Sequence, residues 1–198
     1  MHKCTEKEFL RDVDNHRMTV LVNNGVYRHI RFQKPGTNVC MFDIITWPGH
    51  LCYTGDMGSF LFQRTEDMLM FFRDEKADSK ELYINLSYWA EKCIAGDNGK
   101  GLKEYSPDAF VQAVEDYLAD NEASDDIREA VRKEFLLLKD DGEETVRRAV
   151  SDYECKDGDE IFTFDDFCDY DLTEYTYHFV WCCYALAWGV KVYDRNKN

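Results

Sequence analysis

Residues 39–63 read VCMFDIITWPGHLCYTGDMGSFLFQ, and this stretch decides the fold. Val39 to Trp47 is apolar apart from Asp43, which is typical of a strand buried on both faces. A Pro-Gly turn follows, and His50 to Thr54 returns beside the first strand. Ser59 to Gln63 adds a further strand after a glycine-containing turn. The stretch therefore predicts consecutive antiparallel strands.

A hairpin precedes this stretch, with Asn23-Asn24-Gly25 at its turn. A three-residue loop with the glycine in the left-handed conformation places Val22 opposite Val26 and Met18 opposite Ile30. A two-residue loop would instead place apolar residues opposite polar ones. We therefore expect the three-residue loop, and an antiparallel meander of three to five strands in all.

From Thr65 onward the apolar spacing changes to that of helices. Local start signals support three of the helices: a capping box of Thr5 with Glu8, an N-cap at Ser106 followed by Pro107, and a second capping box of Asp171 with Glu174. Together with the apolar faces, they predict short helices at about 6–15, 68–72 and 86–95, and longer ones at about 107–118, 125–138, 143–153 and from 171 onward.

The last helix contains the apolar run YTYHFVWCCYALAWGV at residues 175–190. A bilayer needs about 20 apolar residues, so the run is too short to span a membrane and indicates a buried helix. It has two apolar stripes, one of which contains Trp181 and Trp188. The helix either lies between the sheet and other helices or presents one stripe to a second copy, in a homodimer.

Taken together, these patterns predict an α+β fold with an N-terminal antiparallel meander followed by a helical region that ends in a long buried helix. We expect one domain over residues 1–198, sheet-rich over 16–64 and helical over 65–198. The eight cysteines contain no CxxC pair and no secretory signal precedes them, which indicates reduced thiols in a cytoplasm and no zinc site.

The formal net charge is −15, and it is concentrated toward the C-terminus. Residues 1–75 carry a net charge of −1, whereas 76–198 carry −14. One block, Glu104 to Asp126, has eight acidic residues and no basic one, and a second, Asp152 to Glu174, has a net charge of −9. Free nucleic acid is a poor partner for such a chain, because phosphates and carboxylates repel each other.

The two acidic blocks contain the candidate binding residues. Asp108, Glu115 and Glu122 recur every seven residues and would form one stripe if the helix extends that far. Such carboxylates either form an ordinary solvated surface or mimic the phosphates of DNA in the basic groove of a partner protein. The residues proposed to bind the partner are Asp108, Glu115, Asp116, Asp120, Glu122, Asp165, Asp166 and Asp169.

A catalytic alternative centres on the predicted strand turn. If Trp47 pairs with His50, Asp43 lies opposite Thr54 on the same face, and burial would raise the pKa of Asp43. Asp43, His50 and the Gly55–Gly58 turn could then serve a small enzyme or a nucleotide-binding protein. No nucleophile with a base is recognisable, no phosphate-loop spacing is present, and a buried aspartate bonded to its neighbours explains Asp43 equally well. The residues predict no catalytic set, metal ligand or cofactor.

Three segments resemble an uncharacterised family of cytoplasmic proteins encoded by tailed phages and prophages. They are WPGHLCYTGDMGSFLFQRTEDMLMFF at 47–72, YINLSYWAEK at 83–92 and EYTYHFVWCCYALAWG at 174–189. The resemblance covers about a third of the chain and carries no catalytic residue with it. It implies the cytoplasm of a bacterial host, where small acidic phage proteins often disarm defence systems such as CRISPR complexes and restriction enzymes.

The leading hypothesis is therefore a non-enzymatic inhibitor that presents a DNA-mimicking acidic surface to the basic groove of a host nucleic-acid-binding defence complex. The alternatives are the small enzyme around Asp43 and His50, and an accessory protein that bridges others through its tryptophans.

Overall fold

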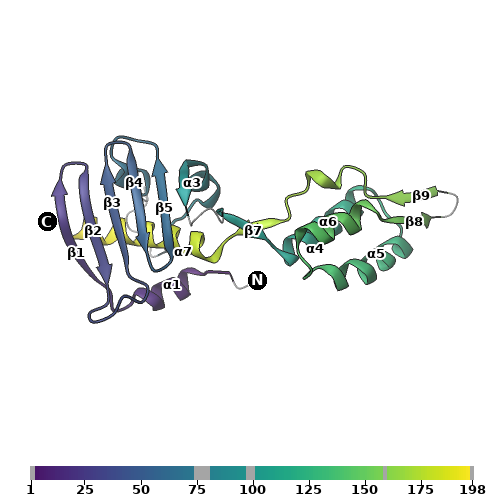
Figure 1. Cartoon of the computed structure of the whole chain (residues 1–198), viewed down its shortest axis with the longest axis horizontal. Coiled ribbons are helices and arrows are strands. Elements are labelled where there is room, and N and C mark those ends of the chain that lie inside the picture. Colours follow the sequence, from purple (N-terminus) through teal and green to yellow (C-terminus); the bar gives the residue numbers. More distant parts are fainter. Residues whose placement is uncertain (1–2, 74–80, 97–100, 158–159, 197–198) are drawn as a thin grey trace. The chain divides into compact units, whose positions relative to one another are not determined.

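The computed structural model describes residues 3–73, 81–96, 101–157 and 160–196, which divide into two compact units (Figure 1). The sheet unit comprises the chain up to residue 102 and again from residue 175, and the inserted unit comprises residues 103–174. Strands followed by helices confirm the α+β class. The contacts that define the two units do not show whether the units fold together. One domain over residues 1–198 therefore stays a prediction.

Six antiparallel strands form the sheet of the sheet unit, in the order β1-β2-β3-β4-β5-β6. They are β1 (Arg17–Asn24), β2 (Tyr27–Gln33), β3 (Phe42–Trp47), β4 (His50–Gly55), β5 (Gly58–Gln63) and β6 (Cys93–Gly96). The first five confirm the N-terminal meander. β6 was expected to be helical, but the helix that begins at Leu86 stops at Lys92, because Cys93 adopts an extended conformation and pairs with Phe62 of β5.

The register between β3 and β4 is the predicted one. The pairs that lie opposite each other include Trp47 with His50, Ile45 with Cys52, and Asp43 with Thr54. Gly49 closes the turn at a φ of +77°, a conformation that glycine adopts without strain. Because neighbours alternate across a strand, Ile44 and Tyr53 are fully buried on the other face of the sheet from Asp43.

The predicted register of the first hairpin is wrong. Asn24 pairs with Tyr27, which leaves a loop of two residues, and Met18 lies opposite Phe32 rather than Ile30. A β-bulge midway along β1 shifts the pairing. β1 is an edge strand whose side chains are almost all exposed, so no buried face selects its register.

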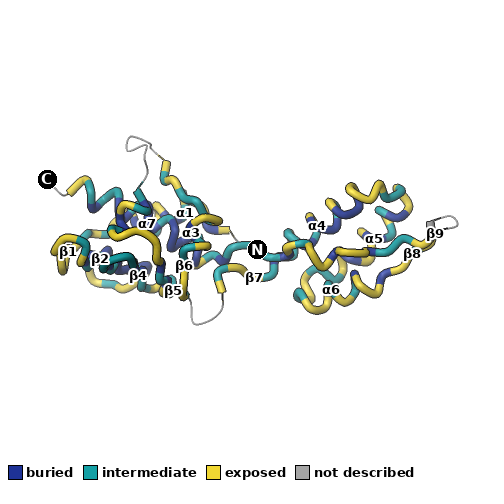
Figure 2. The backbone as a smooth tube through the Cα atoms, turned by 90° about the horizontal axis from the view of Figure 1, so that it is seen from above, coloured by how far each residue is buried: buried dark blue, intermediate teal, exposed yellow. Residues whose placement is uncertain are grey.

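Helices cover one face of this sheet, as α1, α3 and α7 show in Figure 2. The helices of the sheet unit are α1 (Glu6–Val13), α2 (Met68–Phe71), α3 (Leu86–Lys92) and α7 (Tyr177–Arg195). The capping box at α1 is confirmed: the Glu8 amide donates to the Thr5 hydroxyl over 3.3 Å, and the Glu8 carboxylate accepts from the Thr5 amide over 3.1 Å.

α7 begins later than predicted. Its N-cap is Thr176 rather than Asp171, and the expected Asp171 capping box is absent. The Asp171 carboxylate instead accepts hydrogen bonds from the amide and hydroxyl of Thr173 and from Lys103. These bonds lie within the inserted unit. Residues 173–175 then form a short strand, and so the helix starts only at Tyr177.

The predicted burial of the last helix is confirmed. Phe179 packs on Phe60 of the sheet with ring centroids 5.5 Å apart. Trp181, which is fully buried, lies 5.0 Å from Phe9 of α1, and its indole donates a hydrogen bond to Asp12. α7 is thus sandwiched between the sheet and α1. Within the described residues, no helix combines the length and the apolar character needed to cross a membrane.

The inserted unit has its own core. Its elements are β7 (Lys103–Tyr105), α4 (Pro107–Asp120), α5 (Asp125–Leu138), α6 (Glu143–Ser151), β8 (Glu154–Asp157), β9 (Glu160–Thr163), the 3-10 helix η2 (Phe167–Asp169) and β10 (Thr173–Tyr175). The predicted N-cap at Ser106 is confirmed, since its hydroxyl accepts from the Ala109 amide. Buried side chains from the helices and the following loop form the core, among them Phe110, Leu118, Val131, Phe135, Val146 and Phe164.

Candidate functional site

The inserted unit carries the entire net charge of the chain. Residues 103–174 contain 24 acidic and 8 basic side chains, a formal net charge of −16. The rest of the chain contains 15 acidic and 16 basic side chains, a net charge of +1. The acidic excess of residues 76–198 therefore falls within one compact unit, residues 103–174, and the remaining framework is nearly neutral.

The expected seven-residue stripe does not run through all three of its members. α4 ends at Asp120, and Glu122 lies beyond it with a φ of +49°, outside the helix. Glu115 accepts two hydrogen bonds from Arg132, over 2.6 and 2.7 Å, and these bonds lower the pKa of its carboxyl. Asp108 is exposed in the first turn of α4. Although the first block contains no basic residue, Arg132 of α5 thus compensates Glu115.

Some carboxylates of the two blocks lie around a pair of tyrosines. The Tyr170 hydroxyl donates a hydrogen bond to Asp120 over 3.3 Å, and the ring of Tyr170 lies 6.0 Å from that of Tyr117. The Tyr117 hydroxyl in turn donates to the carbonyl oxygen of Thr163, just before the exposed Asp165. Elements that are far apart in the sequence therefore bring carboxylates from both acidic blocks close to the same pair of tyrosines.

Electrostatic effects on the tyrosines support this arrangement. Desolvation, and then the negative charges of Asp120 and Asp116, raise the pKa of Tyr170. Desolvation, and then the charges of Asp165 and Asp166, raise the pKa of Tyr117. We call these carboxylates, namely Asp116, Asp120, Asp165 and Asp166, the acidic cluster.

All four members of the acidic cluster are exposed. Asp116 also accepts a hydrogen bond from Gln112, one turn earlier in α4. Asp169 is exposed as well and ends η2, where its carboxylate accepts a weak hydrogen bond from Cys168. The cluster can therefore offer several carboxylates to a cationic surface without loss of the unit's core.

Asp43, the centre of the catalytic alternative, is occupied by structural contacts. It is 5% exposed, and its carboxylate accepts two hydrogen bonds from Arg31 and contacts Nε2 of His29, all at 2.8 Å. Burial favours the neutral acid, but the bonds from Arg31 and His29 outweigh it, so the pKa of Asp43 lies below its ordinary value. The predicted rise of this pKa is therefore wrong, because the contacts from Arg31 and His29 on β2 were not foreseen.

The other members of that alternative have separate partners. His50 packs on Trp47 with ring centroids 5.2 Å apart, and its Nδ1 lies 2.9 Å from the carbonyl oxygen of Pro48. The Asp56 carboxylate accepts from the Cys40 amide over 2.8 Å. A Cβ at Gly55 would clash with the backbone oxygen of Met41, so close packing of the chain itself requires this glycine.

The adjacent cysteines Cys182 and Cys183 of α7 are fully buried. Burial raises the pKa of Cys182 and Cys183 well above the usual range, which keeps both thiols protonated. Among the described residues, no three histidine, cysteine, aspartate or glutamate side chains gather closely enough to hold a metal ion. The acidic cluster is consequently the strongest candidate for function.

Sequence reasoning missed two features of this site. Arg132 is 17 residues from Glu115, and Tyr170 is 50 residues from Asp120, so neither partner leaves a local signal. No protein-family model, no curated protein and no solved structure matches the chain.

Proposed function

We propose that this protein is a non-enzymatic binding protein whose inserted unit occupies the basic groove of a nucleic-acid-binding protein in place of the nucleic acid. The observation that carries the proposal is the meeting of two acidic blocks around Tyr117 and Tyr170. In the bacterial setting that the phage resemblance implies, the target is a host defence complex of the CRISPR or restriction type.

The spacing of the carboxylates supports mimicry. Asp116 and Asp120 lie one turn apart on α4, which is about 5.4 Å along the helix axis. This is of the same order as the distance between successive phosphates of a nucleic-acid strand. The second block adds Asp165 and Asp166 from a different element, so the charges extend beyond a single helix.

The distribution of charge supports binding of the partner by the inserted unit rather than by the sheet unit. A net charge of −16 on the inserted unit creates a field that attracts a basic surface and repels free nucleic acid. The sheet unit, with a net charge of +1, contributes a framework of nearly neutral charge. Association of this kind is accelerated by electrostatic steering and weakens as salt screens the charges.

The test is recovery of the target with the tagged full-length chain from bacterial lysate, at low and at moderate salt, followed by competition. We expect stoichiometric recovery of a nucleic-acid-handling complex that is lost as salt rises. Adding the duplex or guide nucleic acid that this complex binds should displace the protein from it. A partner that holds its nucleic acid and this protein at the same time would overturn the proposal, as would recovery of no partner.

A further inference from the structure

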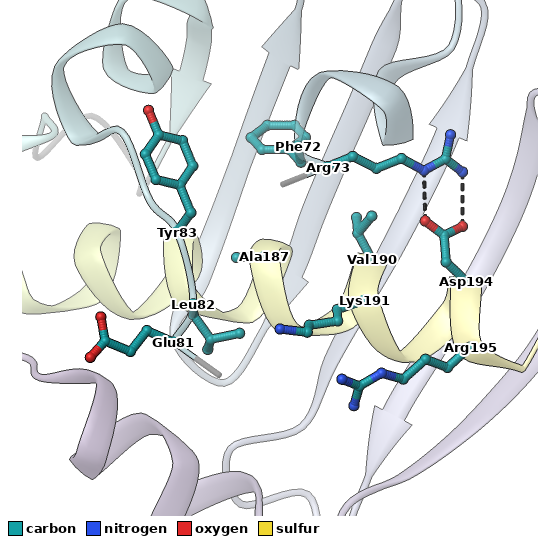
Figure 3. Close-up of a pocket in the computed structure, with 10 residues that line it drawn as sticks. All are labelled: Phe72, Arg73, Glu81, Leu82, Tyr83, Ala187, Val190, Lys191, Asp194 and Arg195. Atoms are coloured by element: carbon teal, nitrogen blue, oxygen red, sulfur yellow. Dashed lines mark hydrogen bonds and ion pairs between the residues drawn. The ribbon is translucent and has the colours of Figure 1, made fainter. Parts of the chain in front are cut away.

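The helices of the sheet unit cover only one of the two faces of its sheet (Figure 2). All four of them, α1, α2, α3 and α7, bury side chains in the core on that face. They are also tied to one another there: Arg73, which follows α2, donates two hydrogen bonds to Asp194 of α7, over 2.6 and 2.8 Å (Figure 3). We call the other side of the sheet, on which Asp43 lies, the open face.

An apolar row crosses the open face from one edge of the sheet to the other. Residues that lie opposite each other in antiparallel strands share a face of the sheet. Each strand contributes one residue to the row, which lies opposite its neighbours in the register: Val22, His29, Ile45, Cys52, Leu61 and Ala95. All of these except His29 are apolar, and we call the set the apolar row.

The apolar row lies outside the buried core of the sheet unit. Val22 is 46% exposed, Ala95 is exposed, and Ile45, Cys52 and Leu61 are each partly exposed. An antiparallel sheet with one face in water normally has polar residues on that face. The row departs from this rule at five of its six positions, and so leaves apolar surface in contact with water in a single copy of the chain.

The open face carries little charge. Histidines apart, the register places three charged side chains of the strands β1 to β6 on it, namely Arg17, Arg31 and Asp43. Asp43 accepts two hydrogen bonds from Arg31, so these two charges compensate each other. The face therefore offers neither a group of carboxylates to a basic protein nor a basic patch to nucleic acid. A second, identical face meets no strong repulsion on it.

The open face is also large enough for a dimer. Its six strands, about 4.8 Å apart, are about 24 Å wide, and the six residues of β3, β4 or β5 extend about 20 Å. The flat area is then roughly 480 Å² in each copy, or about 1,000 Å² in two, which is the area that a specific interface needs. Side chains that project from the sheet add to this area.

We infer that this protein forms a two-fold symmetric dimer in which the open faces of two copies pack against each other. Sheets that pack face to face lie about 10 Å apart, with their side chains in contact. A two-fold axis along the apolar row brings the row of one copy onto that of the other, and so removes both from water. The contact uses residues of the sheet unit alone and does not depend on the function proposed for the inserted unit.

The first test is sedimentation equilibrium of the full chain under reducing conditions, which should show a monomer–dimer equilibrium in the micromolar range. Alkylation of Cys52 by N-ethylmaleimide should slow as the dimer forms. Cys168, which is exposed on the inserted unit, should react at a constant rate and serves as the internal control. A chain that stays monomeric at millimolar concentration, or a dimer in which Cys52 reacts as fast as in the monomer, would overturn the inference.

The second test places a charge in the apolar row. Leu61→Lys should weaken dimerisation roughly a hundredfold, because the symmetry buries an unpaired charge in each copy. Leu10→Lys makes the same change at a 39% exposed position of α1 and should leave dimerisation unchanged. Val22→Lys, on the exposed edge strand, repeats the test where the fold is least disturbed. Far-UV circular dichroism verifies folding, and dimerisation of the folded row variants as strong as that of Leu10→Lys would contradict the inference.

Salt separates this dimer from the binding proposed for the inserted unit. Added salt should leave the dimer unchanged or tighten it, because the contact is apolar and the repulsion between two acidic inserted units is screened. Binding of the basic partner should weaken under the same conditions. A dimer that dissociates as salt rises would overturn the apolar interface, whereas failure to recover a partner would leave the dimer intact.

Discussion

The hydroxyl of Tyr170 donates a hydrogen bond to Oδ2 of Asp120 across 3.3 Å, and this contact joins two acidic segments that lie 50 residues apart in the chain. Asp120 ends α4, whereas Tyr170 follows η2. The contact fixes carboxylates of both blocks on one surface. The affinity of a partner that binds this surface should therefore change when carboxylates of either block are substituted.

Charge reversal in the acidic cluster should abolish partner binding. The variant Asp116→Lys, Asp120→Lys and Asp165→Lys places three positive charges where the proposed partner is basic. All three sites are exposed, so we expect the fold to persist and the affinity to fall by at least a hundredfold, measured against the complex recovered from lysate.

The matched control reverses three other exposed charges of the same unit: Glu129→Lys, Glu134→Lys and Glu154→Lys. Its net charge equals that of the cluster variant. If binding depends on the position of the carboxylates, this control should retain most of its affinity. An equal loss in both triple variants would show that only total charge matters, which contradicts mimicry by a defined surface.

Alkaline pH should destabilise the inserted unit through Tyr105. Its hydroxyl donates to the Lys139 carbonyl over 2.7 Å, and burial, followed by nearby acidic residues, raises its pKa to about 12. The unfolded chain releases this proton near pH 10 and the folded chain holds it, so the contribution is complete below pH 10 and declines from about 10 to about 12.

Tyr105→Phe should therefore reduce the loss of stability between these pH values. It should also cost about 1 kcal/mol at neutral pH, the usual contribution of one hydrogen bond. Urea unfolding across this range, followed by far-UV circular dichroism, measures both effects. The control is Tyr27→Phe, which removes an exposed hydroxyl from the sheet unit. A pH dependence unchanged by Tyr105→Phe would contradict the assignment.

Local signals explain why much of the fold could be predicted. The capping box of Thr5 with Glu8 and the N-cap at Ser106 each depend on residues three apart, which the sequence displays directly. The register of β3 with β4 follows from a tight Pro-Gly turn between them. In each case the chain needs no distant partner to choose its conformation.

Distant partners explain what could not be predicted. The register of β1 has no buried face to fix it, and β6 is a strand only because the edge of β5 is available. Burial of Asp43 was foreseen, but the direction of its pKa depends on Arg31 and His29 of the adjacent strand. The acidic cluster likewise depends on tertiary contacts between α4 and the segment after β9.

Asp43 should stabilise the sheet at neutral pH and lose this effect in acid. Its pKa is lowered in the folded chain, so its contribution is present above the unfolded value of about 3.9 and is lost as the pH falls through the folded value. Asp43→Asn should cost about 1.5 to 3 kcal/mol at pH 7, because buried hydrogen bonds to charged groups are weakened.

Unfolding of Asp43→Asn and of the unsubstituted chain should be compared at pH 7 and at successively lower pH. The difference between them should shrink as the wild-type carboxyl becomes protonated. Asp14→Asn, at an exposed position after α1, serves as control. A difference that stays constant down to the acid transition would mean that shape, rather than charge, decides the effect.

Gly189 allows α7 to approach the sheet closely. A Cβ at this position would lie 2.8 Å from Cδ1 of Ile44 and 3.1 Å from Cε2 of Phe32. Gly189→Ala gains helix propensity of about 1 kcal/mol but suffers overpacking of about 1 to 3 kcal/mol, so we expect a net loss of roughly 1 kcal/mol. Ile44→Val removes the clashing atom, and in the Gly189→Ala background it should cost less than alone. Additive effects in this double-mutant cycle would contradict the steric explanation.

Removal of the inserted unit should leave the sheet unit folded. The Thr176 amide donates to the Leu102 carbonyl over 2.9 Å, so the two ends of the sheet unit are already adjacent and a short glycine-serine linker can join residue 102 to residue 175. Within the inserted unit, the Ser106 amide donates to the Leu172 carbonyl over 2.9 Å, which similarly holds its own ends together. We expect both pieces to fold, because each has a separate buried core.

Circular dichroism and amide NMR dispersion of the two pieces provide the measurement, with thermal unfolding of the full chain beside them. The shortened chain has a net charge of +1, so it is no longer acidic. It should therefore also lose the salt-dependent binding of the partner. If neither piece folds and the full chain unfolds in one transition, the units depend on each other, as a single domain over residues 1–198 requires.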